Sequence, residues 1–578
     1  MNLNPKNMAD TGRLRTGLLA LVAVQAVGYA VIAWLSQAFA HDQGFGERPL
    51  LAVLGLFGVC FACSVASGVV AVRLGEGRWL AGVIVAAALV FRGLLLWTPP
   101  IQEVDIYRYV WDGAVASQGV SPYRYPPAAV LAAHDGPATD AGGTSPELAR
   151  LVGLLDASPG LADALRRVHY PELTTIYPPV SQAVFTVTAM LTPLDASVFT
   201  RITIMKIALL VFDMATVGMV FWLLRAAGRH MGLAIVYAWC PLVIKEFANS
   251  GHLDSIAVCL TMASVCSAAR LWCRCGPHAG RWGIASAVLL GLAVGAKIYP
   301  VILVPLVTVV TMRKAGLRHG SVACAAAILT SIACLAPMVW PTPGGDPPGA
   351  SDPPGTSTGL AAFVSRWEIN DLVFMVVLEN LRPVDPEAHA ATAWFAIVPN
   401  AWRWSAIGPL AGRLGVDTDR AAFWATRGLT GLVFFLVLLP LLFRVAREPS
   451  LPRFLEAAFL TIAWFWLLAP TQNPWYWTWA VPLVPLARGR AWQAVSGLVF
   501  LSYLRFWLVY HYPEASVFGT GYGGGQFFDF FVPWVEFGPW FLWLASGAIL
   551  RRNPVTPTET DGDSLCGQVH RDAGALPL

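Results

Sequence analysis

Charged side chains are scarce in this sequence. They make up 13% of its 578 residues, about half the share found in ordinary soluble domains. Hydrophobic residues make up 56% of the chain, which also carries 24 tryptophans and 29 phenylalanines. The net charge of +4 is small and no basic stripe occurs, which argues against a nucleic-acid partner. We therefore predict a polytopic membrane protein.

Several patterns that carry chemistry in soluble enzymes are also missing. The ten cysteines stand mostly alone inside apolar runs, as small core residues do. The C-x-C of Cys273 and Cys275 is too little for a zinc site. No glycine-rich phosphate-binding loop, internal repeat or soluble domain is evident. The N-terminal MNLNPKNMADTGRLR precedes an apolar run without a cleavage site, so we expect an anchor helix there.

Long apolar segments dominate the rest of the chain, and about 20 such residues cross the hydrocarbon core. Fourteen segments are predicted to cross: 16–38, 49–72, 78–97, 203–225, 231–247, 253–272, 282–297, 298–312, 319–340, 428–446, 454–470, 474–488, 491–511 and 530–550. A further apolar piece, 177–193, has prolines at both ends, and its length alone does not decide whether it crosses.

The positions of Lys and Arg decide that question. If the N-terminus is cytoplasmic and 177–193 does not cross, every short basic connection falls on the cytoplasmic side. If 177–193 crossed, all later connections would invert. We therefore expect a bacterial-type cell (inner) membrane protein with both termini cytoplasmic. Segment 177–193 is then re-entrant or juxtamembrane on the outer face.

This topology divides the chain into six parts. They are an N-terminal three-span segment (1–97), a first outer loop (98–202), a central bundle (203–340), a second outer loop (341–427), a C-terminal bundle (428–550) and a cytoplasmic tail (551–578). The Pro/Gly-rich stretch 341–359 is predicted to be mobile and the tail disordered. The polar motifs GHLDS, AKIYP, SRWEIND and QNPWYW all fall at outer ends of helices.

Ionisable residues also occur inside predicted spans, where they are costly and often functional. Lys206 and Asp213 lie seven residues apart and so share a helix face. Arg505 lies within LSYLRFWLVY. Each of these residues can equally be part of a structural ion pair or extend its side chain to the membrane–water interface. Together they favour a polar interior that opens to the outer face.

An acid pair follows the third predicted span. Glu103 and Asp105 are two residues apart, and in an extended or turn conformation both can face one cavity. A carboxylate there can take a proton from an attacking hydroxyl, as a general base does. The alternative is a solvated acid pair at a helix end, and the spacing alone favours that alternative.

The same stretch, VDIYRYVWDGAVASQGVSPYRYPP, resembles the first outer loop of multi-span GT-C glycosyltransferases. It is most similar to bacterial polyprenyl-phosphate mannosyltransferases and to the first mannosyltransferase of GPI-anchor assembly. The shared features are an acidic pair after a span, Trp111-Asp112-Gly113, Gly119 to Tyr123, and Tyr123 to Pro127. Similar pieces follow in the same order over about residues 95–490: TTIYPPVSQAVF, ANSGHLDS, GAKIYPVILVP and NPWYWTW. Two features depart from the family: two extra helices precede the acidic loop, and the acidic pair is about one residue out of register.

The resemblance implies an all-α GT-C-like bundle and a reaction. Such enzymes move a hexose, for which the resemblance favours mannose, from a polyprenyl phosphate to an acceptor hydroxyl on the outer side, with inversion. Asp105 is expected to be the base, with Glu103 second. Cationic donors for the leaving phosphate are expected at Arg108, His252 and Lys297. The remaining expected substrate-binding residues are Asp112, Tyr123, Tyr177, Asp254, Trp367, Asn473, Trp475 and Tyr476.

Simpler roles exist for several of these residues. His252 can be a capped helix-start residue, Arg108 an interfacial anchor, and the Trp and Tyr residues part of an aromatic belt. No metal ligand set is predicted; the sequence does not require a divalent cation, and Glu103 and Asp105 are the residues that would hold one. The expected partners are a polyprenyl-phosphate sugar donor, a lipid or glycan acceptor and membrane lipids.

Two other function classes compete with a transferase. A transporter or flippase should show paired interrupted helices and repeat symmetry, whereas here the polar motifs gather at outer helix ends. A scaffold subunit of an envelope assembly would carry outer acids that are dispensable. The sequence favours the transferase.

Overall fold

The structure is a computed structural model that describes residues 5–41, 43–136, 145–273, 279–339, 367–385, 392–487 and 491–550. Within these ranges the regular elements are helices, with one isolated bridge between Ile369 and Thr471 and no strand. The prediction of an all-α membrane-type chain is confirmed at this level. The stretch 341–359 and the tail 551–578, predicted to be mobile and disordered, lie outside the described residues.

Long helices make up the bundle, and short ones occupy its connections. The long helices are α1 (Pro5–Leu35), α2 (Leu50–Ala71), α3 (Arg78–Leu96), α9 (Val198–Ala226), α12 (Asp254–Cys273), α13 (Ala279–Ala296), α15 (Leu317–Val339), α19 (Thr418–Arg447), α20 (Leu451–Leu468) and α23 (Gly524–Leu550). Shorter α-helices are α4 (Asp105–Ser117), α5 (Pro127–Asp135), α6 (Pro146–Ala157), α7 (Pro159–Arg166), α8 (Pro179–Met190), α10 (Ile235–Ala238), α11 (Pro241–Ile244), α14 (Val304–Ala315), α17 (Val373–Leu381), α18 (Asn400–Leu414), α21 (Ala491–Leu498) and α22 (Leu504–His511). Single turns of other helix types are η4 (Lys245–Asn249), η5 (Tyr299–Leu303), η6 (Pro474–Trp479), η7 (Val481–Leu486) and η8 (Val499–Tyr503).

Ten helices of the described chain are long and apolar enough to cross a membrane, or eleven if a bent pair at 231–249 counts as one span. The predicted fourteen spans are therefore not confirmed. Three predicted segments fall outside this set for physical reasons. Segment 298–312 divides into η5 and the short α14, and prolines break 474–488 into η6 and η7. Segment 530–550 lies in α23, where Glu536 and the prolines Pro533 and Pro539 make the sequence less apolar.

Segment 177–193 forms the twelve-residue helix α8. At 1.5 Å per residue this helix is about 18 Å long, well short of the roughly 30 Å hydrocarbon core. The turn that follows is held by Arg201, whose guanidinium donates to the carbonyls of Pro193, Leu194 and Ala196. Ser197 then caps α9 by accepting the amide hydrogen of Thr200. This geometry fits a segment that does not cross.

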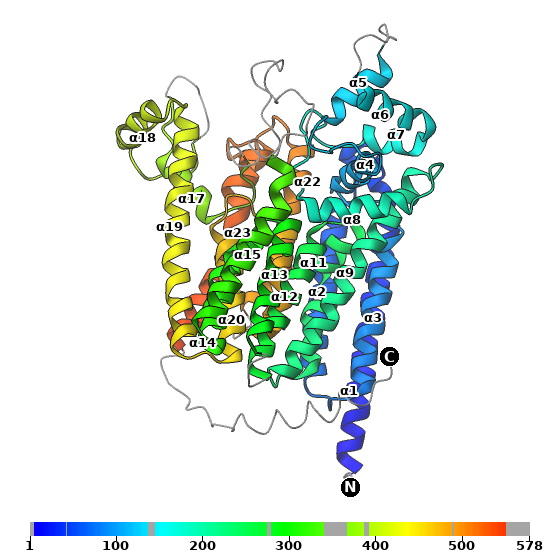
Figure 1. Cartoon of the computed structure of the whole chain (residues 1–578), viewed down its shortest axis with the longest axis vertical. Coiled ribbons are helices and arrows are strands. Elements are labelled where there is room, and N and C mark those ends of the chain that lie inside the picture. The colour runs from blue at the N-terminus through cyan, green and yellow to red at the C-terminus, as the bar shows by residue number, and fades with distance from the viewer. Residues whose placement is uncertain are drawn as a thin grey trace.

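The two ends of the bundle differ in character. Figure 1 shows α4, α5, α6, α7 and α18 together at one end, and the N-terminus at the opposite end. We call these the loop end and the basic end. At the basic end, short connections that carry Lys and Arg touch one another through the following contacts: Arg15 over the Trp79 ring (4.8 Å), His230 to the Leu74 carbonyl (3.0 Å), Arg229 to the Leu486 and Ala487 carbonyls (3.1 Å each), and Trp272 to the Pro449 carbonyl (2.8 Å). The basic connections therefore share one end, as the charge pattern predicts.

The charged residues that were predicted to lie inside spans, Lys206, Asp213 and Arg505, have hydrogen-bond or ion-pair partners. Asp213 accepts from Arg92 at 2.5 Å and from the Tyr237 hydroxyl at 2.8 Å. Lys206 does not pair with Asp213 but donates to the Thr98 carbonyl at 2.7 Å, beyond the end of α3. Arg505 pairs with Asp529 of α23 at 2.6 Å. For Asp213 and Arg505 the structural alternative therefore holds.

Candidate active site

The acid pair lies in the turn between α3 and α4 at the loop end. Asn249 holds this turn, because its side chain accepts from the Ile101 amide (2.8 Å) and donates to Thr98 and Pro99. Gln102 adopts a φ of +67°, an unfavourable backbone conformation for a residue with a side chain. Glu103 and Asp105 follow, both half-buried, and Asp105 opens α4, where the helix dipole favours its negative charge.

A second segment, residues 245–254, packs against this turn. The bent pair of helices α10 and α11, kinked by 48°, runs into the π-helical turn η4; such turns often occur at functional sites. Gly251 follows with a φ of +69°. A Cβ at Gly251 would lie 2.6 Å from Ile106 and 3.0 Å from Lys206. Glycine therefore lets the backbone before α12 approach the first turn of α4.

Four polar side chains form a buried network behind the acid pair, which we call the Glu246 network (Lys245, Glu246, His252 and Tyr503). Glu246 accepts from Lys245 at 3.2 Å and from the Tyr503 hydroxyl at 2.7 Å. Lys245 also donates to the Tyr503 hydroxyl. Lys245, His252, Glu246 and Tyr503 all lie close enough to Glu103 to interact with its charge. The network thus joins the acid pair to two membrane segments.

His252 has unsatisfied hydrogen-bonding capacity. Its Nε2 lies 3.3 Å from Glu246 Oε2, yet neither ring nitrogen has a hydrogen-bond partner in the described part of the chain. The imidazole is buried and stacks on Trp475, with ring centroids 4.2 Å apart. Because a buried polar group without a partner is costly, an imidazole held this way is suited to bind a ligand.

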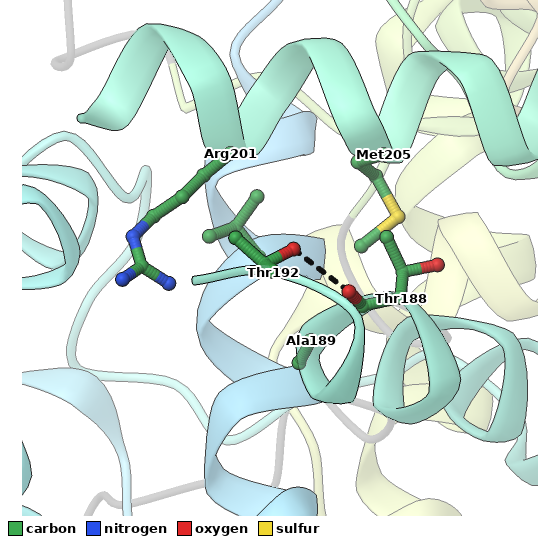
Figure 2. A pocket seen from close by; sticks show the side chains of 6 residues that line it. Thr188, Ala189, Thr192, Arg201 and Met205 are labelled. Atoms are coloured by element: carbon green, nitrogen blue, oxygen red, sulfur yellow. Dashed lines mark hydrogen bonds between the residues drawn. The ribbon is translucent and has the colours of Figure 1, made fainter. Parts of the chain in front are cut away.

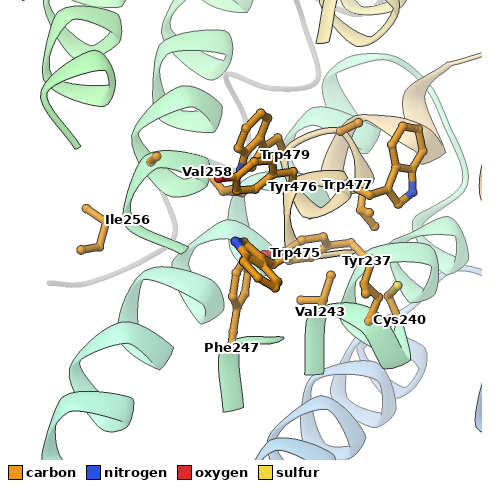
Figure 3. Close-up of a cluster of buried hydrophobic side chains, with 14 of the residues drawn as sticks. Tyr237, Cys240, Val243, Phe247, Ile256, Val258, Trp475, Tyr476, Trp477 and Trp479 are labelled. Atoms are coloured by element: carbon orange, nitrogen blue, oxygen red, sulfur yellow. The ribbon is translucent and has the colours of Figure 1, made fainter. Parts of the chain in front are cut away.

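Lys297 has a protein partner. Its ammonium lies 2.9 Å from Asp254, which also accepts from the Trp479 indole at 2.5 Å. The same ammonium lies over the rings of Tyr476 (4.5 Å) and Trp479 (5.7 Å). Figure 3 shows Trp475, Tyr476 and Trp479 side by side, and the rings of Tyr476 and Trp479 stack at 4.4 Å. Asn473 begins this segment, and its carbonyl accepts from the Tyr476 amide.

The sequence also predicted four residues in or next to α4 and α8: Tyr177, Tyr123, Asp112 and Arg108. Tyr177 lies close to Asp105, and the Tyr123 hydroxyl donates to the Tyr177 carbonyl at 2.7 Å. Asp112 is buried and accepts from Gln182 at 2.9 Å; its burial raises its pKa. Arg108 donates only to backbone carbonyls, those of His169, Tyr170 and Leu173. Arg108 therefore holds the loop before α8 in place.

Burial also changes the pKa of one member of the acid pair, Glu103. It raises the pKa of Glu103 to about 7, although nearby Lys245 and His252 oppose the rise. A carboxyl group with such a pKa exchanges its proton near neutral pH, the range in which general acids and bases work best. The alternative of a fully solvated acid pair does not fit Glu103, which is half-buried.

The structure thus brings together eight sequence-predicted residues: Glu103, Asp105, Tyr177, His252, Asp254, Lys297, Trp475 and Tyr476. Sequence reasoning missed Lys245, Glu246 and Tyr503. The adjacent opposite charges Lys245 and Glu246 inside an apolar run were an available signal, since such residues are rare at membrane depth. Tyr503 gave no signal.

A divalent cation at Glu103 and Asp105 has no support from geometry. No group of three or more His, Cys, Asp or Glu side chains in the described chain is arranged to hold a metal ion. A separate small pocket lies between α4, α8 and α9. Figure 2 shows Arg201 and Met205 on one side of it and Thr188, Ala189 and Thr192 on the other. Its lining contains none of the acids, so the candidate site lies elsewhere.

Comparison with known proteins does not identify a function, so the site is the basis for inferring one. No protein-family model, no curated protein and no solved structure matches the chain. Function therefore has to be argued from the side chains themselves.

Proposed function

We propose that this protein is an integral membrane hexosyltransferase of the GT-C type. It transfers a hexose, with mannose the first choice, from a polyprenyl phosphate to an acceptor hydroxyl on the outer side of a bacterial-type cell membrane. The observation that best supports this proposal is the half-buried acid pair beside a buried imidazole, to which the described residues offer no hydrogen-bond partner. Both lie at the end of a bundle of apolar helices long enough to span a membrane. A lipid-linked substrate would reach such a site from the bilayer.

The reaction assigns one role to each group. Asp105 takes the proton of the acceptor hydroxyl, and the acceptor oxygen forms a bond to the anomeric carbon. The bond from that carbon to the phosphate oxygen breaks, its electron pair stays on the polyprenyl phosphate, and the anomeric configuration inverts. Tyr177 lies close to Asp105, and its hydroxyl orients that carboxylate in the proposed reaction. His252, stacked on Trp475, donates to the departing phosphate.

His252, rather than Lys297 or Arg108, now has the strongest case as the phosphate partner, because the other two already bond to Asp254 and to backbone carbonyls. We expect His252→Gln to raise the KM for the donor by about tenfold to a hundredfold, the range of a hydrogen bond to a charged group. The KM for the acceptor should stay unchanged. If Lys297→Ala raises the donor KM and His252→Gln does not, the role returns to Lys297.

The pKa of Glu103 gives a pH test. Glu103 loses its proton around pH 7, so wild-type transfer should rise between about pH 6 and 8 as this carboxylate becomes able to orient its neighbours. Glu103→Gln should remove that rise and leave a flatter profile of kcat/KM. An unchanged pH profile in Glu103→Gln would assign the transition to another group.

The same substitution has a stability readout. A raised pKa means that the neutral form of Glu103 stabilises the folded protein at low pH. That stabilisation is complete below about pH 4.5, the ordinary value, and is lost as pH rises through about 7. Glu103→Gln should therefore gain melting temperature relative to wild type as pH rises over this window. An equal difference at pH 5 and pH 8 would contradict the raised pKa.

The membrane orientation is part of the proposal. We expect single cysteines at Ala157 and Asp195, both exposed on the flanks of α8, to react with a membrane-impermeant maleimide from the outer side. A cysteine at Arg73, at the basic end, should react only after the membrane is opened, and the unmodified protein serves as the blank. Labelling of 157 and 195 from opposite sides would mean that 177–193 crosses.

A transporter is the alternative, and one observation favours it. The bent pair at 231–249 is an interrupted helix of the kind that transporters use for substrate sites. It is a single pair in the described chain, whereas a repeat architecture needs two in corresponding positions. Uptake of a lipid-linked or small polar substrate into proteoliposomes, without formation of a new glycosidic bond, would favour the transporter.

A further inference from the structure

An aromatic shelf (His169, Tyr170 and Trp367) lies at the loop end, outside the candidate spans. The His169 and Tyr170 rings stack at 4.0 Å, and the Tyr170 and Trp367 rings lie 5.5 Å apart. Tyr170 is 44% exposed although the side chain is large and aromatic. Tyr170 comes from the first large loop and Trp367 from the second. The shelf is therefore the place where the two loops meet.

The backbone at Tyr170 is strained, and the helix of the acid pair holds it. Its φ of +52° is rare for an aromatic residue, and such strain gathers at functional sites. Arg108 donates to the Tyr170 carbonyl at 2.8 Å and to the His169 carbonyl at 3.3 Å. Arg108 stands one helical turn after Asp105 on α4. The same helix therefore positions both the proposed base and the shelf.

Hydrogen bonds also fix the backbone around Trp367. The Thr471 hydroxyl donates to the Trp367 carbonyl at 3.0 Å, and Ile369 bridges to Thr471. Asn370 has a φ of +54° and donates to Glu536 of α23 at 3.2 Å. From Thr471 the chain leads in four residues to Trp475, which stacks on His252. The shelf is thus tied to the candidate active site on both sides.

Hydrogen-bonding groups border the rings. Glu368, next to Trp367, is partly exposed and lies 3.7 Å from Arg382, which pairs with Glu379 at 2.7 Å. Burial raises the pKa of Glu368, so its carboxyl group can donate as well as accept. The Arg382 side chain is 34% exposed, so its guanidinium can donate to a ligand. Glu368 and Arg382 therefore offer both hydrogen-bond donors and an acceptor to a ligand.

We propose that the aromatic shelf, with Glu368 and Arg382, binds the hydroxyl-rich glycan part of the acceptor; this inference rests on the proposed transferase function. Exposed ring faces pack against the C–H faces of a sugar, and carboxyl and guanidinium groups bond its hydroxyls. A lipid tail does not fit, because the shelf combines exposed aromatic rings with charged groups outside the spans. The acceptor is then a glycan or a glycolipid whose sugar lies on the shelf.

Tyr170→Gly is the sharpest test, because glycine accepts the positive φ and so keeps the loop while the ring is removed. We expect it to raise the KM for a glycan acceptor about three- to tenfold, the range of one aromatic contact. The donor KM and kcat at saturating acceptor should stay at wild-type values. Glu368→Gln should act in the same direction, and Tyr170→Phe should behave as wild type. Trp402→Ala, a 68% exposed tryptophan in the same loop, is the matched control and should change nothing.

Direct binding separates this inference from the transferase proposal. Oligomannosides should bind the wild-type protein saturably in detergent, as measured by saturation-transfer NMR, and Tyr170→Gly should weaken that binding. Such a result supports the shelf even if no donor is ever transferred. If the wild-type protein transfers hexose but Tyr170→Gly leaves both the acceptor KM and glycan binding unchanged, the shelf assignment is overturned. Absence of glycan binding to the wild-type protein also overturns it.

Discussion

Asp105→Asn should lower hexose transfer by about 10²–10⁴, the usual contribution of a positioned general base. The substitution keeps the shape of this half-buried side chain, so folding should be preserved. The donor should still bind, since its phosphate contacts His252 in the proposed mechanism. The measurement is kcat for a lipid-linked hexose, with donor binding and melting temperature recorded for each variant.

Glu103→Gln is the matched control for that experiment. It removes a carboxylate two residues away, in the same turn, and should cost less than Asp105→Asn at pH 8. A larger loss in Glu103→Gln than in Asp105→Asn would make Glu103 the base, in agreement with its pKa of about 7. Near-wild-type transfer in both variants would remove the acid pair from the mechanism.

Glu246→Gln should have the largest effect on stability. Glu246 is fully buried and accepts from Lys245 and Tyr503. Loss of one partner of a buried ion pair leaves the other charge uncompensated, which costs about 3–5 kcal/mol. We expect a markedly lower melting temperature and loss of transfer, since Glu103 depends on the same network.

The double variant Lys245→Met/Glu246→Gln separates the two effects. Removal of both charges should recover most of the lost stability, because a buried pair contributes little net free energy compared with neutral side chains. Transfer should remain low, since His252 and Glu103 lose their charged neighbours. Full recovery of transfer in the double variant would show that the Glu246 network serves folding alone.

The sequence predicts the membrane class and the ends of the bundle well, because both depend on local signals. Apolar length marks ten of the spans, and the positions of Lys and Arg group the basic connections at one end. The number of spans was set too high where prolines break an apolar run, as in 474–488. Apolarity alone does not distinguish a long helix from two 3-10 turns.

The candidate site is only partly readable from sequence. Motifs at helix ends pointed to Asp105, His252 and Trp475, which the structure brings together. The partners of charged groups depend on contacts between distant segments. Tyr503 meets Glu246 across 257 residues, and no local pattern encodes such a pairing. Lys297 was expected to be available to a phosphate and instead pairs with Asp254 for the same reason.

One measurement tests the central proposal most directly. Purified protein in detergent is incubated with radiolabelled polyprenyl-phosphate mannose, and with other polyprenyl-phosphate hexoses, in the presence of a glycan or glycolipid acceptor. We expect a labelled, inverted glycoside with the wild-type protein and none above background with the Glu103→Gln/Asp105→Asn double variant. Equal transfer by wild type and double variant, or no transfer of any hexose by a folded wild-type protein, would contradict it.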